Sequence, residues 1–431
     1  MADRDGRVEA RSEAKPRFPL HLQIVTGIVI GLVLGPILGR DANRLGDIGK
    51  LVIQLIKAAA APLLFLSIVQ AILKTEVQAR AALRLFFWAT VNASIALGFG
   101  LLLSNLIQPG RSLSGFVPAK PEEIAAFANK KVDLMGVVGG VVPNSLVEPF
   151  VENTVLAIVL IAVLIGGALR TVRSERFAAG GAGIPAIEDA VEALLRAMEV
   201  VLGWVIKLIP FAVFGVVARA VGEHGYGPLH GLGVYVLVGV GGLILHALVT
   251  YQIWLVFIAR MPLGRFWREA KVPIAYAVGA NSSLATLPIT LRALDRLGVR
   301  KSASALGACV GTNFNNDGII LYEGMAVLFV AQASGIPLSL PQQALIAFVC
   351  MVAAMGVAGV PEAGFVSLAL VLNTVGLPIE ILPLLLTVDW IIARGRSVTN
   401  VLSDMVLSIL LDRGRDGEPV EASAPVAAGP N

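Results

Sequence analysis

The sequence contains few of the residues on which catalytic and disulfide-linked proteins depend. Its 431 residues include two cysteines and four histidines, and charged residues make up only 15%. Cys309 and Cys350 lie in apolar runs without the spacing of metal ligands, so neither a disulfide nor a zinc site is indicated. Met1–Pro19 carries charges of both signs but no apolar core beside a cleavage site. We therefore expect a disordered cytoplasmic tail rather than a signal peptide.

What the sequence has in excess is apolar surface. Hydrophobic residues make up 56% of the chain, and the mean hydropathy is +0.80. A soluble core does not need so many apolar residues, so the composition indicates an integral membrane protein with many helices. We expect it in the cell inner membrane, in contact with lipids and without a nucleic-acid partner.

The positions of the basic residues predict the topology of the first half. Lysine and arginine follow every second apolar run, at 74–84, 170–176 and 260–271, and such loops stay in the cytoplasm. The long polar segment Gln108–Gly136 lies between two of these loops, and we place it outside. Six spans are predicted before Met261: Leu20–Gly39, Ile48–Leu73, Leu85–Ile107, Asn144–Leu169, Val191–Val221 and Leu232–Ile258.

The sequence of the second half predicts apolar segments that are interrupted by polar residues. Pro273–Leu294 is apolar but contains Asn281-Ser282-Ser283, and basic residues flank it on both sides, so it must enter the membrane and turn back. A span with a polar cluster follows, then a second hairpin at Ala344–Leu377 and a final span at Ile381–Leu411. This pattern predicts an all-α membrane fold of eight crossing helices plus two re-entrant helical hairpins, an inverted repeat with both termini cytoplasmic. Residues 412–431 are predicted to form a disordered tail.

Gly311–Gly318 is the most polar stretch of an apolar run from Ala303 to Val330. It contains three asparagines and one aspartate, and an aspartate at the centre of a bilayer costs about 2.5–3.5 kcal/mol. Carboxylate and amide oxygens suit hard cations, and glycine and asparagine tolerate an unwound backbone. A polar patch that only joins helices is the alternative, but so many oxygens together favour a cation site.

A polar stripe runs along the final span. Asp389, Arg396, Asn400 and Asp404 are separated by seven, four and four residues, which places them near one helical face. The guanidinium of Arg396 cannot lose its proton, so within a membrane it needs an anion, and its shape fits a carboxylate. Substrate binding is the favoured role, and a permanent pair with Asp389 or Asp404 is the alternative. Arg394 lies on another face and is expected to be structural.

The two hairpin tips offer further groups for an anion. The first carries Ser282-Ser283 and the second contains Gly359 and Gly364. Half-helix N-termini at these tips would present N–H groups to a carboxylate. Small residues equally serve close helix packing, so each tip alone is a weak signal. Two tips, an arginine and two aspartates at one depth favour a carrier over a passive channel.

An intramembrane hydrolase is the hypothesis from another class. It needs a nucleophile with a base, or two aspartates with a catalytic water. The serines lack a Gly-x-Ser-x-Gly setting, and His246, isolated in a span, is expected to be a packed core residue. Asp317 and Asp404 could form an aspartyl pair, but the neighbouring asparagines suit ion coordination better. We therefore expect neither an enzyme nor a cofactor.

Four segments of the second half match the motifs of one known family. Asn315-Asn316-Asp317-Gly318, followed by Leu321-Tyr322-Glu323, resembles its Asn-Met-Asp-Gly-Thr and Leu-Tyr-Glu motif. Ser282 to Pro288 and Gly359 to Gly364 are similar to its two hairpins, and Asp389 to Asp404 is similar to its final helix. The chain thus resembles the glutamate-transporter family, the bacterial dicarboxylate/amino acid:cation symporters, over nearly the whole membrane part.

The resemblance implies a homotrimer in which a mobile transport domain moves like an elevator against a static scaffold, driven by cation symport. Within a transporter domain of residues 20–411, the scaffold would be mainly 20–75 and 144–221, and the transport part mainly 85–107, 232–258 and 265–411. The implied cation ligands are oxygens of Thr90, Gly311, Asn313, Asn315, Asp317, Ala354, Met355, Val357, Asn400 and Asp404. The implied substrate ligands are Ser282, Ser283, Val360, Gly364, Arg396, Ser397 and Asn400.

Four residues depart from the family pattern. Asn316 replaces a methionine, Ile319 replaces a threonine, and Val91 stands where a sodium-binding serine is expected, which argues against a third sodium site. Ala393 replaces the aspartate that binds the substrate ammonium in amino-acid carriers, and a methyl group cannot compensate a buried ammonium. Arg396 without an ammonium partner predicts a small carboxylate substrate, a C4-dicarboxylate first, with aspartate or glutamate as the alternative. The coupled cation is sodium or a proton.

Overall fold

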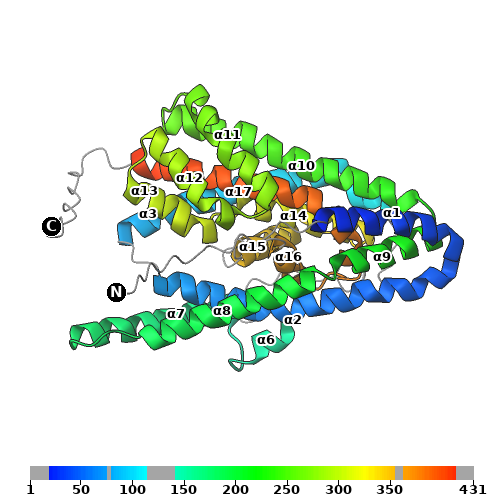
Figure 1. Ribbon diagram of the computed structural model, residues 1–431, viewed down its shortest axis with the longest axis horizontal. Coiled ribbons are helices and arrows are strands. Elements are labelled where there is room, and N and C mark those ends of the chain that lie inside the picture. The colour runs from blue at the N-terminus through cyan, green and yellow to red at the C-terminus, as the bar shows by residue number, and fades with distance from the viewer. Residues whose placement is uncertain (1–18, 75–78, 114–140, 355–362, 414–431) are drawn as a thin grey trace, which may run out of the picture.

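The computed structural model describes residues 19–74, 79–113, 141–354 and 363–413, and within these ranges the chain forms helices and their connections only. Helices α2, α7 and α8 run along one side of the molecule and α10 and α11 along the opposite side, with α14, α15 and α16 between them (Figure 1). The described residues do not include three predicted site residues, Met355, Val357 and Val360, or the part of the second hairpin tip that precedes residue 363.

Several helices have the length and composition of membrane spans. Four helical stretches of the described chain qualify, namely Leu20–Lys74, Arg80–Ile107, Val155–Ala178 and Leu229–Ile258. The first contains α1 (Leu20–Leu38) and α2 (Asn43–Lys74), between which a 3-10 turn reverses the chain (Figure 1). The others correspond to α3 (Ala79–Ile107), α7 (Val155–Ala178), and α10 (Gly227–Ile253) with its π-helical end (Trp254–Ile258). The protein is therefore a multi-pass membrane protein.

Two of the predicted spans differ from the structure in shape. The fourth was expected to run from Asn144 to Leu169, but the short helix α6 (Glu148–Glu152) ends at Asn153 in a left-handed conformation, and α7 starts separately. The fifth is a bent pair, α8 (Pro185–Ile206) and α9 (Ile209–His224), which meet at 40°. Pro210 explains this break, since proline lacks the N–H that would continue α8.

The reversal of the first hairpin is confirmed. Helices α11 (Leu263–Ala280) and α12 (Ser283–Leu297) pack on each other and join at Asn281 and Ser282. Its first helix begins ten residues before the predicted start at Pro273, because Leu263–Val272 is amphipathic rather than uniformly apolar. Two short apolar helices, α15 (Leu340–Ala354) and α16 (Ala363–Val375), likewise pack on each other on either side of the second tip.

The polar cluster interrupts its helix as predicted. The chain passes from α13 (Lys301–Ser304) through a π-helical segment (Ala305–Val310) and a 3-10 turn (Gly311–Asn313) to α14 (Asp317–Ala333). Such departures from α geometry release backbone groups, which membrane proteins tolerate only where protein or a cavity surrounds them. By contrast, α17 (Leu382–Arg413) is continuous through all four polar residues of its stripe.

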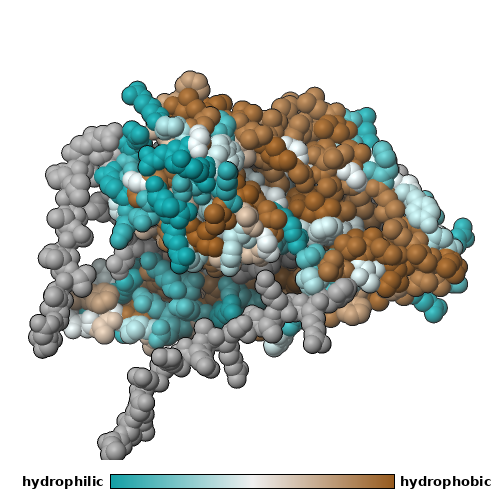
Figure 2. Space-filling model, turned by 45° about the horizontal axis from the view of Figure 1, so that its top comes forward, coloured by the Kyte–Doolittle hydropathy of each residue, from teal (hydrophilic) through white to brown (hydrophobic). Residues whose placement is uncertain are grey.

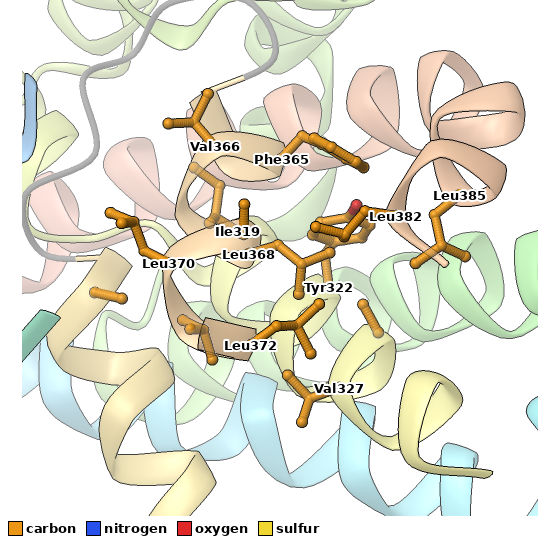
Figure 3. Packing of buried hydrophobic residues seen from close by; sticks show 14 of the residues in the cluster. Ile319, Tyr322, Val327, Phe365, Val366, Leu368, Leu370, Leu372, Leu382 and Leu385 are labelled. Atoms are coloured by element: carbon orange, nitrogen blue, oxygen red, sulfur yellow. The ribbon is translucent and has the colours of Figure 1, made fainter. Parts of the chain in front are cut away.

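Apolar packing fixes the second hairpin against the broken helix. Figure 3 shows Phe365, Leu368 and Leu372 of α16 among Ile319 and Tyr322 of α14 and Leu382 of α17. These side chains are almost fully buried, and each such side chain contributes about 1.5–3 kcal/mol of hydrophobic stabilisation. The start of α16 is thereby held close to the polar stripe of α17.

The outer surface fits a bilayer. Figure 2 shows apolar residues over a broad band of one face and hydrophilic residues gathered toward its two ends. Many large apolar side chains are exposed along this chain, Phe257 and Leu237 among the most exposed at 72% and 73%. Such surface is stable in lipid but not in water.

A glycine stripe brings α1 against α9. Gly27, Gly31 and Gly35 recur every four residues and are buried where α1 packs on α9. A methyl group at Gly31 would lie 2.9 Å from both the carbonyl oxygen of Phe214 and Cβ of Val217. The spacing permits a close helix crossing that larger residues would prevent.

We expect Gly31→Val to lower the thermal midpoint of the purified protein in detergent, because overpacking a tight contact costs about 1–3 kcal/mol. The matched control is Gly98→Val in α3, where an added side chain meets open space. Equal midpoints for the two variants would show that the α1–α9 contact does not depend on glycine.

Candidate functional site

The site forms where the broken helix crosses α17. The N–H of Gly318, at the start of α14, donates to Oδ1 of Asn400 at 2.8 Å. A methyl group at Gly318 would lie 2.6 Å from the carbonyl oxygen of Arg396, so only glycine permits this approach. The crossing brings the cluster of α14 and the stripe of α17 together, as the sequence predicted.

Arg396 is buried and bound by two carboxylate oxygens. Its Nη1 and Nη2 donate to Oδ1 and Oδ2 of Asp389 at 2.8 and 2.9 Å, and its side chain is 4% exposed. The guanidinium carbon lies 4.0 Å from the ring centre of Tyr322, a cation–π contact. Of the two partners considered from the sequence, Asp389 is therefore the one that pairs with Arg396. Arg394 instead donates to the carbonyl of Trp390, as a structural arginine would.

The second hairpin reaches Arg396, and the first reaches the neighbouring Ser397. A methyl group at Gly364, in the first turn of α16, would be 3.3 Å from Cζ of Arg396. From the other hairpin, Oδ1 of Asn281 accepts a hydrogen bond from Oγ of Ser397 at 3.2 Å. The start of α16 therefore lies against the guanidinium, and Asn281, at the end of α11, contacts the adjacent residue of α17.

The two serines of the first tip have local partners. Oγ of Ser282 accepts a hydrogen bond from the N–H of Ala285 at 3.1 Å and so caps α12. Oγ of Ser283 lies 3.4 Å from Oγ1 of Thr312, in the turn before α14. Asn281, which the sequence analysis did not include in the site, faces Ser397 from a left-handed conformation. Its place just after a helix, where asparagine favours that conformation, was the available signal.

One oxygen of Asp317 is surrounded by donors and the other is not. Oδ2 accepts from Oγ of Ser403 at 2.5 Å and from the hydroxyl of Tyr251 at 3.1 Å, and Nε2 of His246 lies 3.4 Å away. Oδ1 has no hydrogen-bond partner among the described residues, and the same is true of Oδ1 of Asn315 and Oδ1 of Asp404. We call these three acceptors the open oxygens.

The open oxygens are suited to a hard cation. Asp317, Asn315 and Asp404 are 0–3% exposed, and a buried acceptor without a donor costs about 1–3 kcal/mol. Asp404 lies beside Asn315 and Thr312, and a methyl group at Gly311 would be 3.6 Å from Oδ1 of Asp404. Two carboxyl groups and one amide are ligands for a hard cation rather than for a soft metal.

A second chain of hydrogen bonds leads to the other hairpin. Nδ2 of Asn400 donates to Oδ1 of Asn316 at 3.2 Å, and Nδ2 of Asn316 donates to the carbonyl of Ala354 at 2.9 Å. Asn316 therefore joins α17 to the end of α15. Of the other predicted cation ligands, Asn313 lies in the 3-10 turn and Thr90 is half-buried in α3.

Four polar residues near Asp317 were missed by sequence reasoning or given another role. Ser403 contacts both Asp317 and Asn315, and Asn92 of α3 reaches Ser403 at 3.4 Å. Tyr251 and His246 come from α10, whose apolar sequence gives no sign of which face carries a function. His246 does pack against the rings of Phe99 and Tyr251, as expected of a core residue, but it also contacts Asp317.

Glu323 is a further buried carboxyl group. It is fully buried in α14, and neither of its oxygens has a hydrogen-bond partner among the described residues. Arg396 contributes the nearby positive charge. Glu323 was quoted from the sequence only as part of a family motif, although an acid within a membrane helix is itself a signal of function.

Comparison with known proteins shows to which protein family the chain that carries this site belongs. Residues 20–414 match the model of the sodium:dicarboxylate symporter family. The chain belongs to this family. Among curated members, the C4-dicarboxylate transport protein of Delftia acidovorans is 30% identical over 434 residues, which cover 95% of both chains.

Other curated members of the symporter family are similar to this chain at comparable identity and over most of its length. C4-dicarboxylate transport protein 2 of Polaromonas naphthalenivorans is 32% identical over 84% of this chain and 81% of its own. The C4-dicarboxylate transport protein of Brucella anthropi is 29% identical over 94% and 92%. Family membership identifies a membrane carrier and decides against the intramembrane hydrolase.

The buried pair of this symporter predicts a stability effect. Asp389→Asn should lower the thermal midpoint in detergent, because breaking one side of a buried ion pair costs about 3–5 kcal/mol. The double variant Asp389→Asn/Arg396→Gln should be more stable than the single variant, since it leaves no lone buried charge. If the two substitutions act additively, the pair contributes no coupling energy and this account of Arg396 is wrong.

Proposed function

We propose that the protein is a secondary active symporter that carries C4-dicarboxylates together with a monovalent cation, sodium in the first place. The observation that carries the proposal is the buried guanidinium of Arg396 beside Gly364 of the second hairpin, with a methyl group at Ala393 one turn earlier. The names of the curated relatives support this substrate class.

Arg396 can hold an anion without releasing Asp389. A guanidinium has five N–H donors in one plane, so it can bind two carboxylates from different sides. The first turn of α16, at Gly364, has no side chain to block a carboxylate, and the N-terminus of that helix is electrostatically favourable for an anion. One carboxylate of the substrate is therefore assigned to Arg396 and Gly364, with Asn400 one turn further along the same face of α17 and Ser397 next to Arg396 in the chain.

The second end of the substrate distinguishes a dicarboxylate from an amino acid. Ala393 is 2% exposed and offers only a methyl group. The nearest acid on that helix, Asp389, is already bound by Arg396. An ammonium would find no counter-charge at Ala393, and burying it would be costly. A succinate-like dianion avoids this cost, and aspartate or glutamate remains the runner-up.

The open oxygens of Asp317, Asn315 and Asp404 are proposed to bind the coupling cation, with the carbonyl of Gly311 and the side chain of Thr90 as further ligands. A second cation would lie near the carbonyls of Asn313 and Ala354. Sodium fits an oxygen-only set. A proton as coupling ion is the second candidate, and the buried Glu323, without a described hydrogen-bond partner, is the observation in its favour.

The architecture proposed for this function is an elevator of eight crossing helices plus two re-entrant hairpins, in an inverted repeat with both termini cytoplasmic, assembled as a homotrimer. The packing of α2 with α7, α8 and α9, and of α14 with α3, α10 and α17, supports a scaffold and a transport part. Nζ of Lys57 in α2 donates to Oδ1 of Asn373 in α16 at 2.8 Å, across the proposed boundary. Such contacts would have to break when the transport part moves.

Selectivity is the first test of this function. In liposomes with purified protein, Arg396→Ala should lose uptake of labelled succinate, because a charge-assisted bidentate contact is worth a few kcal/mol, roughly a hundredfold in affinity. Ala393→Asp should shift competition from succinate toward L-aspartate through attraction of the ammonium and repulsion of the dianion. If L-aspartate displaces succinate from the wild type by a wide margin, the substrate is an acidic amino acid.

Cation dependence is the second test. Asp404→Asn should raise the sodium concentration for half-maximal uptake, and Asp317→Asn should raise it further, because Asn315 shares its site. The rise should be at least about tenfold for Asp317→Asn, since one ionised ligand is removed from a buried cation. Wild-type sodium dependence in both variants would exclude the open oxygens as the coupling site.

A further inference from the structure

Helix α10 presents three polar side chains to Asp317. His246, Thr250 and Tyr251 are 0%, 3% and 0% exposed and lie within two turns of one another. Oγ1 of Thr250 is 3.1 Å from Nδ1 of His246, and Nε2 of His246 is 3.4 Å from Oδ2 of Asp317. Thr250 and His246 therefore form a chain of contacts to the carboxylate, which Tyr251 contacts directly.

The tautomer of His246 follows from its partners. An ionised carboxylate only accepts hydrogen bonds, so Nε2 must carry a proton where it faces Asp317. In the neutral imidazole this leaves Nδ1 as the acceptor, and the hydroxyl of Thr250 can donate to it. The ring itself is held between Phe99 and Tyr251, with edge contacts at centroid distances of 6.0 and 4.9 Å.

All the donors reach the same oxygen of Asp317. His246, Tyr251 and Ser403 approach Oδ2, whereas Oδ1 is one of the open oxygens. Ser403 also accepts a hydrogen bond from Nδ2 of Asn315 at 2.7 Å, which fixes that amide with its own Oδ1 open. The donors thus determine which oxygens are left for a ligand and prevent rotation of the carboxylate.

We propose that His246, oriented by Thr250, is a positioning residue of the cation site. It does not touch the ion. It donates Nε2–H to Oδ2 of Asp317 and so holds Oδ1 beside the open oxygens of Asn315 and Asp404. This inference rests on the cation symport proposed above.

The matched variants are His246→Gln and His246→Asn. The amide nitrogen of glutamine is as many bonds from the backbone as Nε2 of histidine, so it can still donate to Asp317. The amide of asparagine is one bond shorter and corresponds to Nδ1, so it cannot. Both are neutral polar amides, and they differ mainly in reach. His230→Asn, exposed at the start of the same helix and about 24 Å away along it, is the control for loss of a histidine.

The readout is equilibrium sodium binding in detergent, measured without substrate as the rise of the thermal midpoint with sodium at constant ionic strength. We expect His246→Asn to raise the half-saturating sodium concentration about tenfold, as loss of a hydrogen bond to a charged group does. His246→Gln should recover most of that loss. Thr250→Val should give an intermediate shift, and His230→Asn none. Affinity for succinate at saturating sodium should change less than about threefold in every variant.

Two results would overturn the positioning role alone. One is equal half-saturation for His246→Asn, His246→Gln and the wild type. The other is a parallel loss of sodium and succinate affinity with no recovery in His246→Gln, which indicates a packing role. If the wild-type protein shows no stabilisation by Na⁺, Li⁺ or K⁺, symport with an alkali-metal cation is contradicted, and the positioning role falls with it.

Discussion

The structure depends on burying a dense set of polar groups at the crossing of α14 and α17 inside an apolar protein. Each of these groups must be matched, because an unmatched polar atom in a membrane interior costs several times what it costs at a surface. Arg396 is matched by Asp389, Gly318 by Asn400, and one oxygen of Asp317 by three donors. The three open oxygens lack a donor within the described residues, as do the two carboxyl oxygens of Glu323 further along α14. The proposed position of the coupling cation therefore follows from the buried acceptors that have no hydrogen-bond donor.

Charge balance links the proposed cation and anion sites. Asp389 and Arg396 neutralise each other, so Asp317 and Asp404, when ionised, add two uncompensated negative charges to the same buried region. A dicarboxylate could not enter beside them at low dielectric without bound cations. The hydrogen bonds from Asn400 through Asn316 to Ala354 also connect α17 to the second hairpin. Cation binding can thereby favour substrate binding and act on the hairpin, which is what symport requires.

The sequence predicted those features that depend on strong local contrasts. Three asparagines and an aspartate in an apolar run had to break the helix, and basic residues on both sides of Pro273–Leu294 had to turn the chain back. It did not predict the contribution of α10, because single polar residues in an apolar helix do not show which neighbour they face. Nor could it choose between Asp389 and Asp404 for Arg396. Both lie about two turns away on the same face, and only the direction of the side chain decides. The sequence also did not predict two interruptions of the spans. The bend at Lys207 depends on Pro210, and the break before α7 depends on the left-handed conformation of Asn153.

The most direct test of the account is accumulation of labelled succinate by purified protein in liposomes, with sodium and proton gradients imposed separately. The account predicts that an inward sodium gradient drives accumulation above equilibrium, and that a proton gradient without sodium does not. Accumulation driven by the proton gradient alone would indicate that Glu323, and not the set of open oxygens, is the coupling group. Equilibration without accumulation under either gradient would contradict coupled transport altogether.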